Sequence, residues 1–373
     1  MTPLIRIIGS LNADMVSVTR RFPEPGETIT ATSFTTSAGG KGANQAVACG
    51  RLSRWKSSAT HSASSNEPIR VEMVGAVGGR DAHFQSLLRP TLEQSGLDTA
   101  RIRTVDEDYT GVAVIIVDSS AGGENRILFS PGANYSGMQA IPDVLSTGLA
   151  PPIPDVIVMQ GEIPIETVIG ILREIAKYKD ASGKKGIEAG PEVMFNPAPA
   201  PPGGLPEDVY AAVDHLIMNE TEAELMAPKT EELLRVVPAV KGAGLREQVA
   251  QYFHKLGVTY VVITLGAKGV WYSACDAGTA IAADGESRFT NEIPAAKVSQ
   301  VLDTTAAGDT FIGGYATHIA RWRERQRQSG HEASKRERYQ VVMDEAMKRA
   351  GRASARCVER QGAMDSIPWE DEI

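Results

Sequence analysis

The sequence predicts an α/β protein with a doubly wound, mostly parallel sheet and a small antiparallel sheet beside it. Short runs rich in β-branched and aliphatic residues alternate with longer segments whose apolar residues recur at helical spacing, which is typical of a parallel sheet covered by helices. In two stretches, about 11–41 and 103–131, strand-like runs are separated by turn residues instead of helices. Such runs pair as hairpins, and we therefore expect a second sheet there.

The expected strands are short and apolar, as buried strands are. In chain order they are "LIRII", "VEMVGAV", "DVIVMQ", "DHLIMN" and "YVVITL" for the large sheet, and "ETITATSF", "GVAVIIV" and "NRILFS" for the small one. The expected helices are "GGKGANQAVACGRL", "DAHFQSLLRPTLEQSG", "PIETVIGILREIAKYK", "TEAELM", "LREQVAQYFHKLG" and the segment that follows Asp309. Glycine or a capping Asp or Thr stands near the ends of many of them.

Composition and charge are those of an ordinary folded protein and point to no nucleic-acid or membrane partner. The chain has 373 residues, 42% hydrophobic and 23% charged, with a net charge of -8, which is ordinary for a folded protein. The charge balance gives no reason to expect nucleic acid or an anionic membrane as a partner. The basic stretch 321–340 is better interpreted as a solvated helix end and loop than as a binding patch.

Cysteine usage indicates a reducing compartment, and the apolar runs predict neither a signal peptide nor a membrane span. Cys49, Cys275 and Cys357 are far apart, so they predict neither a disulfide framework nor a zinc site. No run approaches 18 apolar residues, and the N-terminal apolar run is too short for a signal peptide. We expect a cytoplasmic protein, with the nucleus as an open alternative.

The stretch "DTTAAGDTF" could build an anion pocket. Ala306, Ala307 and Gly308 allow a tight turn before a helix, and a helix N-terminus presents unpaired N–H groups to an anion. Asp309 would then face the bound group. Taken alone, the stretch is more typical of an ordinary N-cap.

Two further stretches place polar groups where a sheet of this kind binds ligands. "SAGGKGANQAVA" is a glycine-rich loop before a helix, but it is not a P-loop because Gly42 follows Lys41 and Thr35 replaces the first glycine. "GSLNAD" and "MQGEIP" each follow a strand with amide or carboxyl side chains that suit sugar hydroxyls. Asx turns and a plain helix start explain the same residues equally well.

The second half of the chain offers two candidates for phosphate and nucleotide contacts. "NETEAELM" is explained by a capping box, or by Asn219 and Glu222 organising hydrated Mg²⁺. "TLGAKG", from Thr264 to Gly269, would let a nucleotide lie on glycine backbone or would simply form a hairpin turn.

Taken together, these stretches resemble the ribokinase-like carbohydrate kinases. The matching blocks keep the family's order over nearly the whole chain: "GSLNAD", "PEPGETIT", "AGGKGANQAVA", "TGVAVI", "PGAN", "NPAPA", "NETEAE", "TLGAKGVW", "DTTAAGDTF" and "RQGAMDSIPW". The resemblance implies a single Rossmann-like domain over 1–373, with the small sheet as a lid. It also implies transfer of the ATP γ-phosphate to the O5 hydroxyl of D-ribose.

The resemblance further implies a role for each matching residue. Asp309 is expected as catalytic base, and the backbone of Ala306, Ala307 and Gly308 as an anion hole. The expected sugar ligands are Asn12, Asp14, Gly40, Lys41, Asn44, Glu162 and Asp309; the nucleotide contacts are Asn219, Thr264, Gly266, Lys268, Gly269 and Gly308. Glu222 is expected to act on Mg²⁺ through water, and a K⁺ site is expected at Asp303, Thr305, Cys357, Arg360, Gly362 and Ser366.

Some alternatives stay open at this point. A kinase for another sugar or for a nucleoside, or an inactive sugar-sensing regulator, would share the fold. Gly351 stands where the family often has His or Asn near the adenine, which puts a side-chain contact there in doubt. Unpaired lid edges suggest a homodimer.

Overall fold

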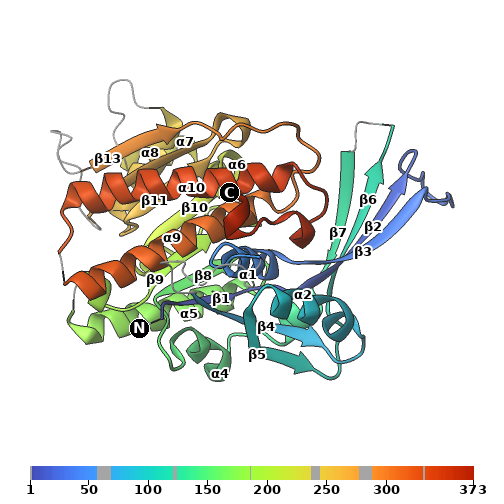
Figure 1. Cartoon of the computed structure of the whole chain (residues 1–373), viewed down its shortest axis with the longest axis horizontal. Helices are drawn as coiled ribbons and strands as arrows, with labels where there is room; N and C mark the ends of the chain where they lie inside the picture. Colours follow the sequence, from blue (N-terminus) through green and yellow to red (C-terminus); the bar gives the residue numbers. More distant parts are fainter. Residues whose placement is uncertain are drawn as a thin grey trace.

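A nine-stranded sheet runs through the middle of the protein, with helices on both faces (Figure 1). The computed structural model describes residues 2–56, 69–120, 124–184, 186–236, 244–276, 288–330 and 332–373. A four-stranded sheet projects from one side of this body (Figure 1). The architecture confirms the predicted α/β fold with a mostly parallel sheet and a smaller second sheet.

The large sheet has the order β13-β12-β11-β10-β9-β8-β1-β4-β5. Its strands are β1 Leu4–Ile8, β4 Arg70–Gly78, β5 Leu97–Val105, β8 Val156–Gln160, β9 Glu192–Asn196, β10 His215–Asn219, β11 Tyr260–Thr264, β12 Val270–Cys275 and β13 Arg288–Ile293. Pairing is parallel from β5 to β11 and antiparallel for β12 and β13. The central strands are buried along their length, which explains why most of their residues are apolar.

The small sheet has the order β3-β2-β6-β7. Its strands are β2 Asn12–Thr19, β3 Ser33–Gly39, β6 Gly111–Asp118 and β7 Glu124–Ser130. The central pair, β2 and β6, is parallel, so the prediction of a wholly antiparallel sheet is wrong. These two strands are joined by a long crossover through the large sheet, which lets both run in the same direction.

The strand predicted over "ETITATSF" begins later than expected. β3 starts only at Ser33, which lies opposite Val18 of β2. Because β2 ends one residue further on, at Thr19, no partner remains for residues 27–31. The pairing partner therefore decides where this strand begins.

Two hydrophobic clusters hold the helices against the two faces of the large sheet. One cluster contains α1 (Lys41–Arg51), α9 (Ala307–Ser329) and α10 (Val342–Val358); the other contains α5 (Ile165–Ser182) and α8 (Leu245–Lys255). Shorter helices complete the layers: α2 Arg89–Gln94, α3 Ala133–Ser136, α4 Pro142–Leu145, α6 Glu220–Met226 and α7 Thr230–Val236. Among the described residues, no helix is long and apolar enough to cross a membrane.

A buried ionic network ties α9 to the sheet. Arg323 of α9 donates to Glu192 Oε1 of β9 at 2.9 Å, and the other oxygen of Glu192 lies 2.8 Å from His215 Nε2. The hydroxyl of Tyr315, also on α9, lies 2.6 Å from His215 Nδ1. The prediction that 321–340 is solvated is therefore wrong at Arg323, because α9 packs that side chain onto β9.

Candidate active site

Two adjoining cavities lie where the parallel strands end. The first, called here the polar cavity, measures about 440 Å³. It gathers these predicted residues from distant parts of the chain: Asn12, Asp14, Gly40, Lys41, Asn44, Glu162, Asn219, Glu222, Thr264, Thr305, Ala306, Gly308 and Asp309. Ligands collect at this edge of an open parallel sheet because the loops that follow the strands converge there.

The start of the small sheet supplies Asn12 and Asp14. Asn134 of α3 donates from Nδ2 to Asn12 Oδ1 at 2.8 Å and accepts from the Leu11 N–H at 2.8 Å, which fixes the turn between β1 and β2. Sequence reasoning assigned no role to Asn134, although it lies within the matching block "PGAN". Gly40 has φ of 90°, and a Cβ there would lie 2.8 Å from the Asn12 nitrogen, so only glycine fits.

Glu162 is held at the entrance to helix α1. Its Oε2 accepts from the Ser10 hydroxyl at 2.5 Å and from the Lys41 backbone N–H at 3.0 Å. Because two donors share one oxygen, the other oxygen is left to meet a ligand in the polar cavity. Ser10, which sequence reasoning also missed, thus joins the ends of β1 and β8.

Asp309 is buried in the first turn of α9 with its carboxylate held from two sides. Asn44 Nδ2 donates to Oδ2 at 3.0 Å, and Gln45 Nε2 donates to Oδ1 at 2.9 Å. Helix α9 begins at Ala307, and the N-cap is Ala306 in the left-handed region at φ 59°. Asp309 is therefore the third residue of the helix rather than its N-cap, so the simple capping interpretation fails.

Several carboxylates surround one lysine in this cavity. Burial raises the pKa of Asp14 to about 7, helped by repulsion from Glu162 and Asp309 and opposed by Lys41. Burial alone would lower the pKa of Lys41, but Asp309 and Glu162 outweigh it and leave that pKa raised. Lys41 is therefore a firm cation, whereas Asp14 gains or loses its proton near neutral pH.

The first turn of α9 offers backbone N–H groups to an anion. The Thr310 N–H bonds to Ala306 O at 2.8 Å, and the Ala307 N–H makes a long bond to Thr304 O at 3.3 Å. A Cβ built on Gly308 would meet no atom within 4 Å, so this residue faces open space. Gly308 borders both cavities, which puts the helix N-terminus between them.

Asn219 and Glu222 form the capping box that their spacing suggested. Asn219 Oδ1 accepts from the Glu222 N–H at 2.8 Å, and Glu222 Oε2 accepts from the Asn219 N–H at 2.9 Å. Both side chains also line the polar cavity, and burial raises the pKa of Glu222. Capping and ligand binding are compatible here because the cap uses one oxygen of Glu222.

The second cavity, called here the apolar cavity, measures about 590 Å³. Of the predicted residues, Thr264, Gly266, Gly269, Ala307, Gly308 and Gly351 line it. "TLGAKG" does form the hairpin turn between β11 and β12, and its glycines face this cavity. Lys268 lines neither cavity, and Asn219 lines only the polar one.

The residues predicted to hold a monovalent cation lie just before α9, in the last turn of α10 and in the segment that follows α10. Asp303 Oδ1 accepts from the Thr305 N–H at 2.9 Å, and Oδ2 accepts from the Gly362 N–H at 3.0 Å. Burial opposes ionisation of Asp303, but these hydrogen bonds outweigh it and lower its pKa. Cys357 Sγ lies 3.1 Å from Ser366 Oγ and 3.6 Å from Thr305 O, whereas Arg360 instead donates to Glu372 at 3.0 Å.

Two more observations concern metals and cysteines. Within the described ranges, no group of three or more His, Cys, Asp or Glu side chains is placed to hold a metal ion directly. Cys49, Cys275 and Cys357 are all buried, and Cys49 and Cys357 are free thiols.

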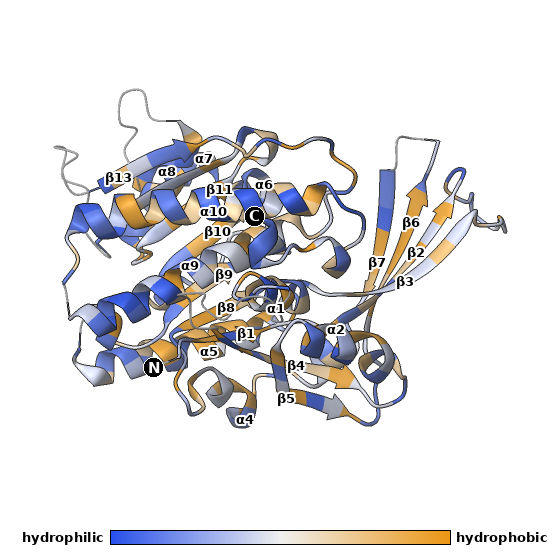
Figure 2. Cartoon of the chain, viewed as in Figure 1, coloured by the Kyte–Doolittle hydropathy of each residue, from blue (hydrophilic) through white to orange (hydrophobic). Residues whose placement is uncertain are grey.

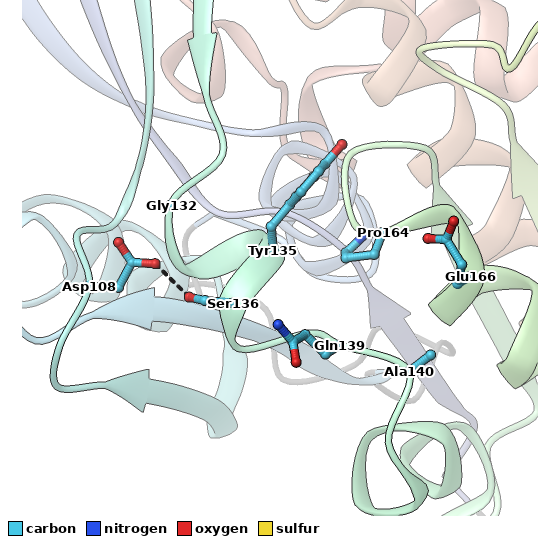
Figure 3. Close-up of a pocket in the computed structure, with 8 residues that line it drawn as sticks. All are labelled: Asp108, Gly132, Tyr135, Ser136, Gln139, Ala140, Pro164 and Glu166. Carbon is cyan, nitrogen blue, oxygen red and sulfur yellow. Dashed lines mark hydrogen bonds between the residues drawn. The ribbon is translucent and has the colours of Figure 1, made fainter.

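A third cavity, of about 530 Å³, lies beside helix α3 and contains none of the predicted residues (Figure 3). Its lining includes Tyr135, Gln139 and Glu166, and Ser136 Oγ donates to Asp108 Oδ2 at 2.5 Å. Nothing in the sequence had singled out these residues.

Comparison with known proteins relates this geometry to a family. The ribokinase of Schizosaccharomyces pombe is 34% identical over 98% of this chain and 94% of its own length. The ribokinase of Haemophilus influenzae is 32% identical over 100% of this chain and 97% of its own length. The structure of Arabidopsis thaliana ribokinase complexed with ribose and ATP superimposes with a TM-score of 0.70 at 27% identity, covering 100% of this chain and 97% of that one.

A family model reaches the same result from the sequence alone. The model described as "pfkB family carbohydrate kinase" matches residues 2–370. This span includes both sheets and every residue of the polar cavity. The chain therefore belongs to the pfkB family of carbohydrate kinases.

Proposed function

We propose that the chain is an ATP-dependent ribokinase, which transfers the γ-phosphate of ATP to the O5 hydroxyl of D-ribose and forms ribose 5-phosphate and ADP. The observation that carries this proposal is the position of Asp309. Its carboxylate lines the polar cavity on the first turn of α9, one residue from Gly308, which borders both cavities. The names of the two curated relatives and the ribose and ATP bound by the Arabidopsis protein support the same substrates.

The polar cavity offers the groups that a small polyol needs. Asp14 and Glu162 accept hydrogen bonds from hydroxyls, while Asn12, Lys41 and Asn44 supply amide and ammonium groups. Asn44 is nine-tenths buried, and among the described residues its Oδ1 has no hydrogen-bond partner. A buried amide oxygen without a partner is costly, so a sugar hydroxyl that donates to it would be bound firmly.

Transfer itself requires positioning and charge stabilisation. Asp309 accepts the proton of the O5 hydroxyl as the oxygen bonds to the γ-phosphorus and the bond from phosphorus to the bridging oxygen of ADP breaks. The backbone N–H groups of Ala306, Ala307 and Gly308, at the start of α9, stabilise negative charge on the transferring phosphoryl oxygens. The adenosine of ATP would occupy the apolar cavity, next to Gly266 and Gly269.

The donor atoms fit two ions that such a reaction uses. Mg²⁺ prefers oxygen ligands and keeps several waters, so Glu222 would hold it through water, consistent with the lack of a direct cluster in the described ranges. The oxygens of Asp303, Thr305 and Ser366 suit K⁺. Bound K⁺ would supply positive charge beside the first turn of α9.

The proposal extends to assembly and location. We propose a homodimer formed through the lid, because β7 is exposed along its whole length and the sheet ends in two unpaired edges, β3 and β7. Apolar residues run along β2, β6 and β7 (Figure 2). We place the enzyme in the cytoplasm.

The test is a substrate panel on purified protein. ADP formation would be measured with ribose, 2-deoxyribose, fructose and adenosine, in Mg²⁺ with K⁺, Na⁺ or a bulky organic cation. We expect kcat/KM to be highest for ribose and the rate to be highest in K⁺. Turnover of another acceptor but not of ribose would overturn the ribokinase assignment, and equal rates in the three cations would overturn the K⁺ site.

A further inference from the structure

We propose that Gln45 is a positioning residue of this kinase, which fixes the orientation of the Asp309 carboxylate for proton transfer. The proposal rests on the role of Asp309 as base given above. Gln45 lies in α1, one residue after Asn44, and its side chain is completely buried. It does not line the polar cavity, so any effect it has on catalysis must pass through a neighbour.

The hydrogen bonds of Gln45 leave its amide only one orientation. Its Nε2 donates to Asp309 Oδ1 at 2.9 Å and to Asn196 Oδ1 at 3.2 Å, which uses both N–H groups. Its Oε1 accepts from Gln160 Nε2 at 2.7 Å. A flipped amide would set Oε1 against the Asp309 carboxylate and an N–H group against another N–H group, so the amide cannot turn.

Asn196 and Gln160 hold Gln45 from the ends of two neighbouring strands. Asn196 ends β9 and donates from Nδ2 to Ile217 O at 3.0 Å. Gln160 ends β8 and is completely buried, and among the described residues its Oε1 has no hydrogen-bond partner. Burying the Gln160 amide with an unpaired oxygen costs free energy. Among the described residues, its side chain donates one hydrogen bond, to Gln45, and we take this bond as the reason that the amide is there.

Asn44 and Gln45, adjacent residues of α1, hold different oxygens of the Asp309 carboxylate. Asn44 holds Asp309 Oδ2 and lines the cavity, where the sugar competes for its amide. Gln45 holds Oδ1 from the protein interior, where no ligand reaches. The carboxylate therefore keeps one fixed oxygen when the sugar binds. A base that is misplaced by a fraction of an ångström loses much of its effect, so this bond matters for the rate and not for affinity.

The first test is the isosteric variant Gln45→Met, which keeps the volume and removes all three hydrogen bonds. We expect kcat for ribose phosphorylation to fall about 10- to 100-fold. The KM values for ribose and ATP should change less than about threefold, because Gln45 contacts neither cavity. Gln251→Met is the matched control, since Gln251 is a buried glutamine of α8 that lines neither cavity, and it should keep the wild-type kcat.

The second test uses Gln160→Met alone and together with Gln45→Met. If Gln160 acts only by orienting Gln45, the single variant loses less kcat than Gln45→Met, and the double variant loses no more than Gln45→Met alone. A merely structural role would instead give additive losses and would lower the melting temperature in step with the rate. Should Gln45→Met fail to fold, the Gln160→Met variant still tests the proposal, because an unchanged kcat there overturns it.

The role of Gln45 and the identity of the sugar are tested by different experiments. The wild-type substrate panel decides the sugar, and the Gln45 variants are then measured with whichever acceptor the wild type phosphorylates. A kcat within threefold of wild type for Gln45→Met, or a loss confined to KM, overturns the positioning role whatever the sugar is.

Discussion

At the residue scale, Asp309 shows that an aspartate whose sequence context is typical of a simple cap can have its carboxylate held in another way. The cap position belongs to Ala306, and the carboxylate of Asp309 points sideways to Asn44 and Gln45. Sequence alone could not distinguish the two, because the difference is a shift of three residues in the N-cap, from the expected Asp309 to Ala306. The neighbouring amides, which come from a helix more than 250 residues away in the chain, decide it.

The Asp309→Asn variant is expected to lose nearly all turnover while it still binds ribose. An amide cannot accept the O5 proton, and removal of a general base commonly lowers the rate by about 10² to 10⁴. The measurement is kcat by ADP release together with the ribose Kd from calorimetry. Turnover within tenfold of wild type would contradict the role of Asp309 as base.

Ribose affinity is expected to depend on the protonation of Asp14. The pKa of this carboxyl is raised to about 7 by burial and by Glu162 and Asp309, so the free protein is largely protonated there at pH 6 and largely ionised at pH 8. The ionised form accepts hydrogen bonds from hydroxyls more strongly. The Kd for ribose should therefore rise as the pH falls from 8 to 6, whereas Asp14→Asn should bind weakly with a flat profile. A wild-type profile as flat as that of the variant would contradict this.

Protonation of Asp14 is also expected to make the free energy of unfolding depend on pH. The sign is opposite to that for a carboxylate in a salt bridge, whose pKa is lowered by folding. Because the pKa of Asp14 rises from 3.8 to about 7 on folding, the folded state holds a proton that the unfolded state releases between these values. Stability is therefore lost as the pH rises through that window. Asp14→Asn should have a higher free energy of unfolding than the wild type at pH 8 and a similar one at pH 4. Urea unfolding at the two pH values measures this, and an equal or lower stability at pH 8 would contradict it.

At the scale of elements, the strands and helices of the large sheet could be predicted because their apolar spacing is a local property. What could not be predicted depends on pairing between distant segments. The parallel alignment of β2 with β6 and the late start of β3 follow from which strand lies opposite, and no local pattern records that. Arg323 was missed for a related reason, because a basic helix segment does not show that one of its arginines meets a buried Glu192.

The Arg323→Met variant is expected to destabilise the protein by about 3 to 5 kcal/mol. Glu192 would keep His215 as a neighbour but would lose its permanently charged partner inside the protein, and an unpaired buried charge is costly. Arg325→Met, on an exposed position of the same helix, is the control and should stay within about 0.5 kcal/mol of wild type. The free energy of unfolding in urea measures both.

A compensating change sharpens that test. Combining Arg323→Met with Glu192→Gln removes the buried charge together with its partner, so the double variant should recover part of the lost stability. If the double variant is as unstable as the sum of the two single variants, Arg323 contributes through packing rather than through neutralising Glu192.

At the scale of the whole molecule, the sequence predicted sugar-binding and nucleotide-binding residues but not how the two sets lie relative to each other. The ordered motifs placed the expected sugar ligands other than Asp309 in the first half of the chain and the expected nucleotide contacts in the second. The structure shows that the two cavities share Thr264, Thr304 and Gly308. Under the proposed function, acceptor and donor would therefore meet at the N-terminus of α9. Gln45, which holds Asp309, and Gln160, which holds Gln45, were not identified. Their side chains face the interior, and glutamine is an ordinary residue in a helix or strand.

The four-stranded sheet, the expected lid, projects from the body of the molecule and exposes large apolar side chains. Phe34, Ile127 and Leu128 are each more than half exposed, at 60%, 58% and 62%. Ile127 and Phe129 also line the polar cavity, whereas Phe34 and Leu128 do not. A second copy that covers this surface would remove it from water, so we expect a dimer at micromolar concentration by sedimentation velocity. Leu128→Lys would place a charge in the interface and should shift the protein to monomer, while Lys177→Glu, on the exposed face of α5, should leave the dimer intact.

A wild type that sediments only as a monomer, or a Leu128→Lys variant that remains dimeric, would show that the lid does not form the interface.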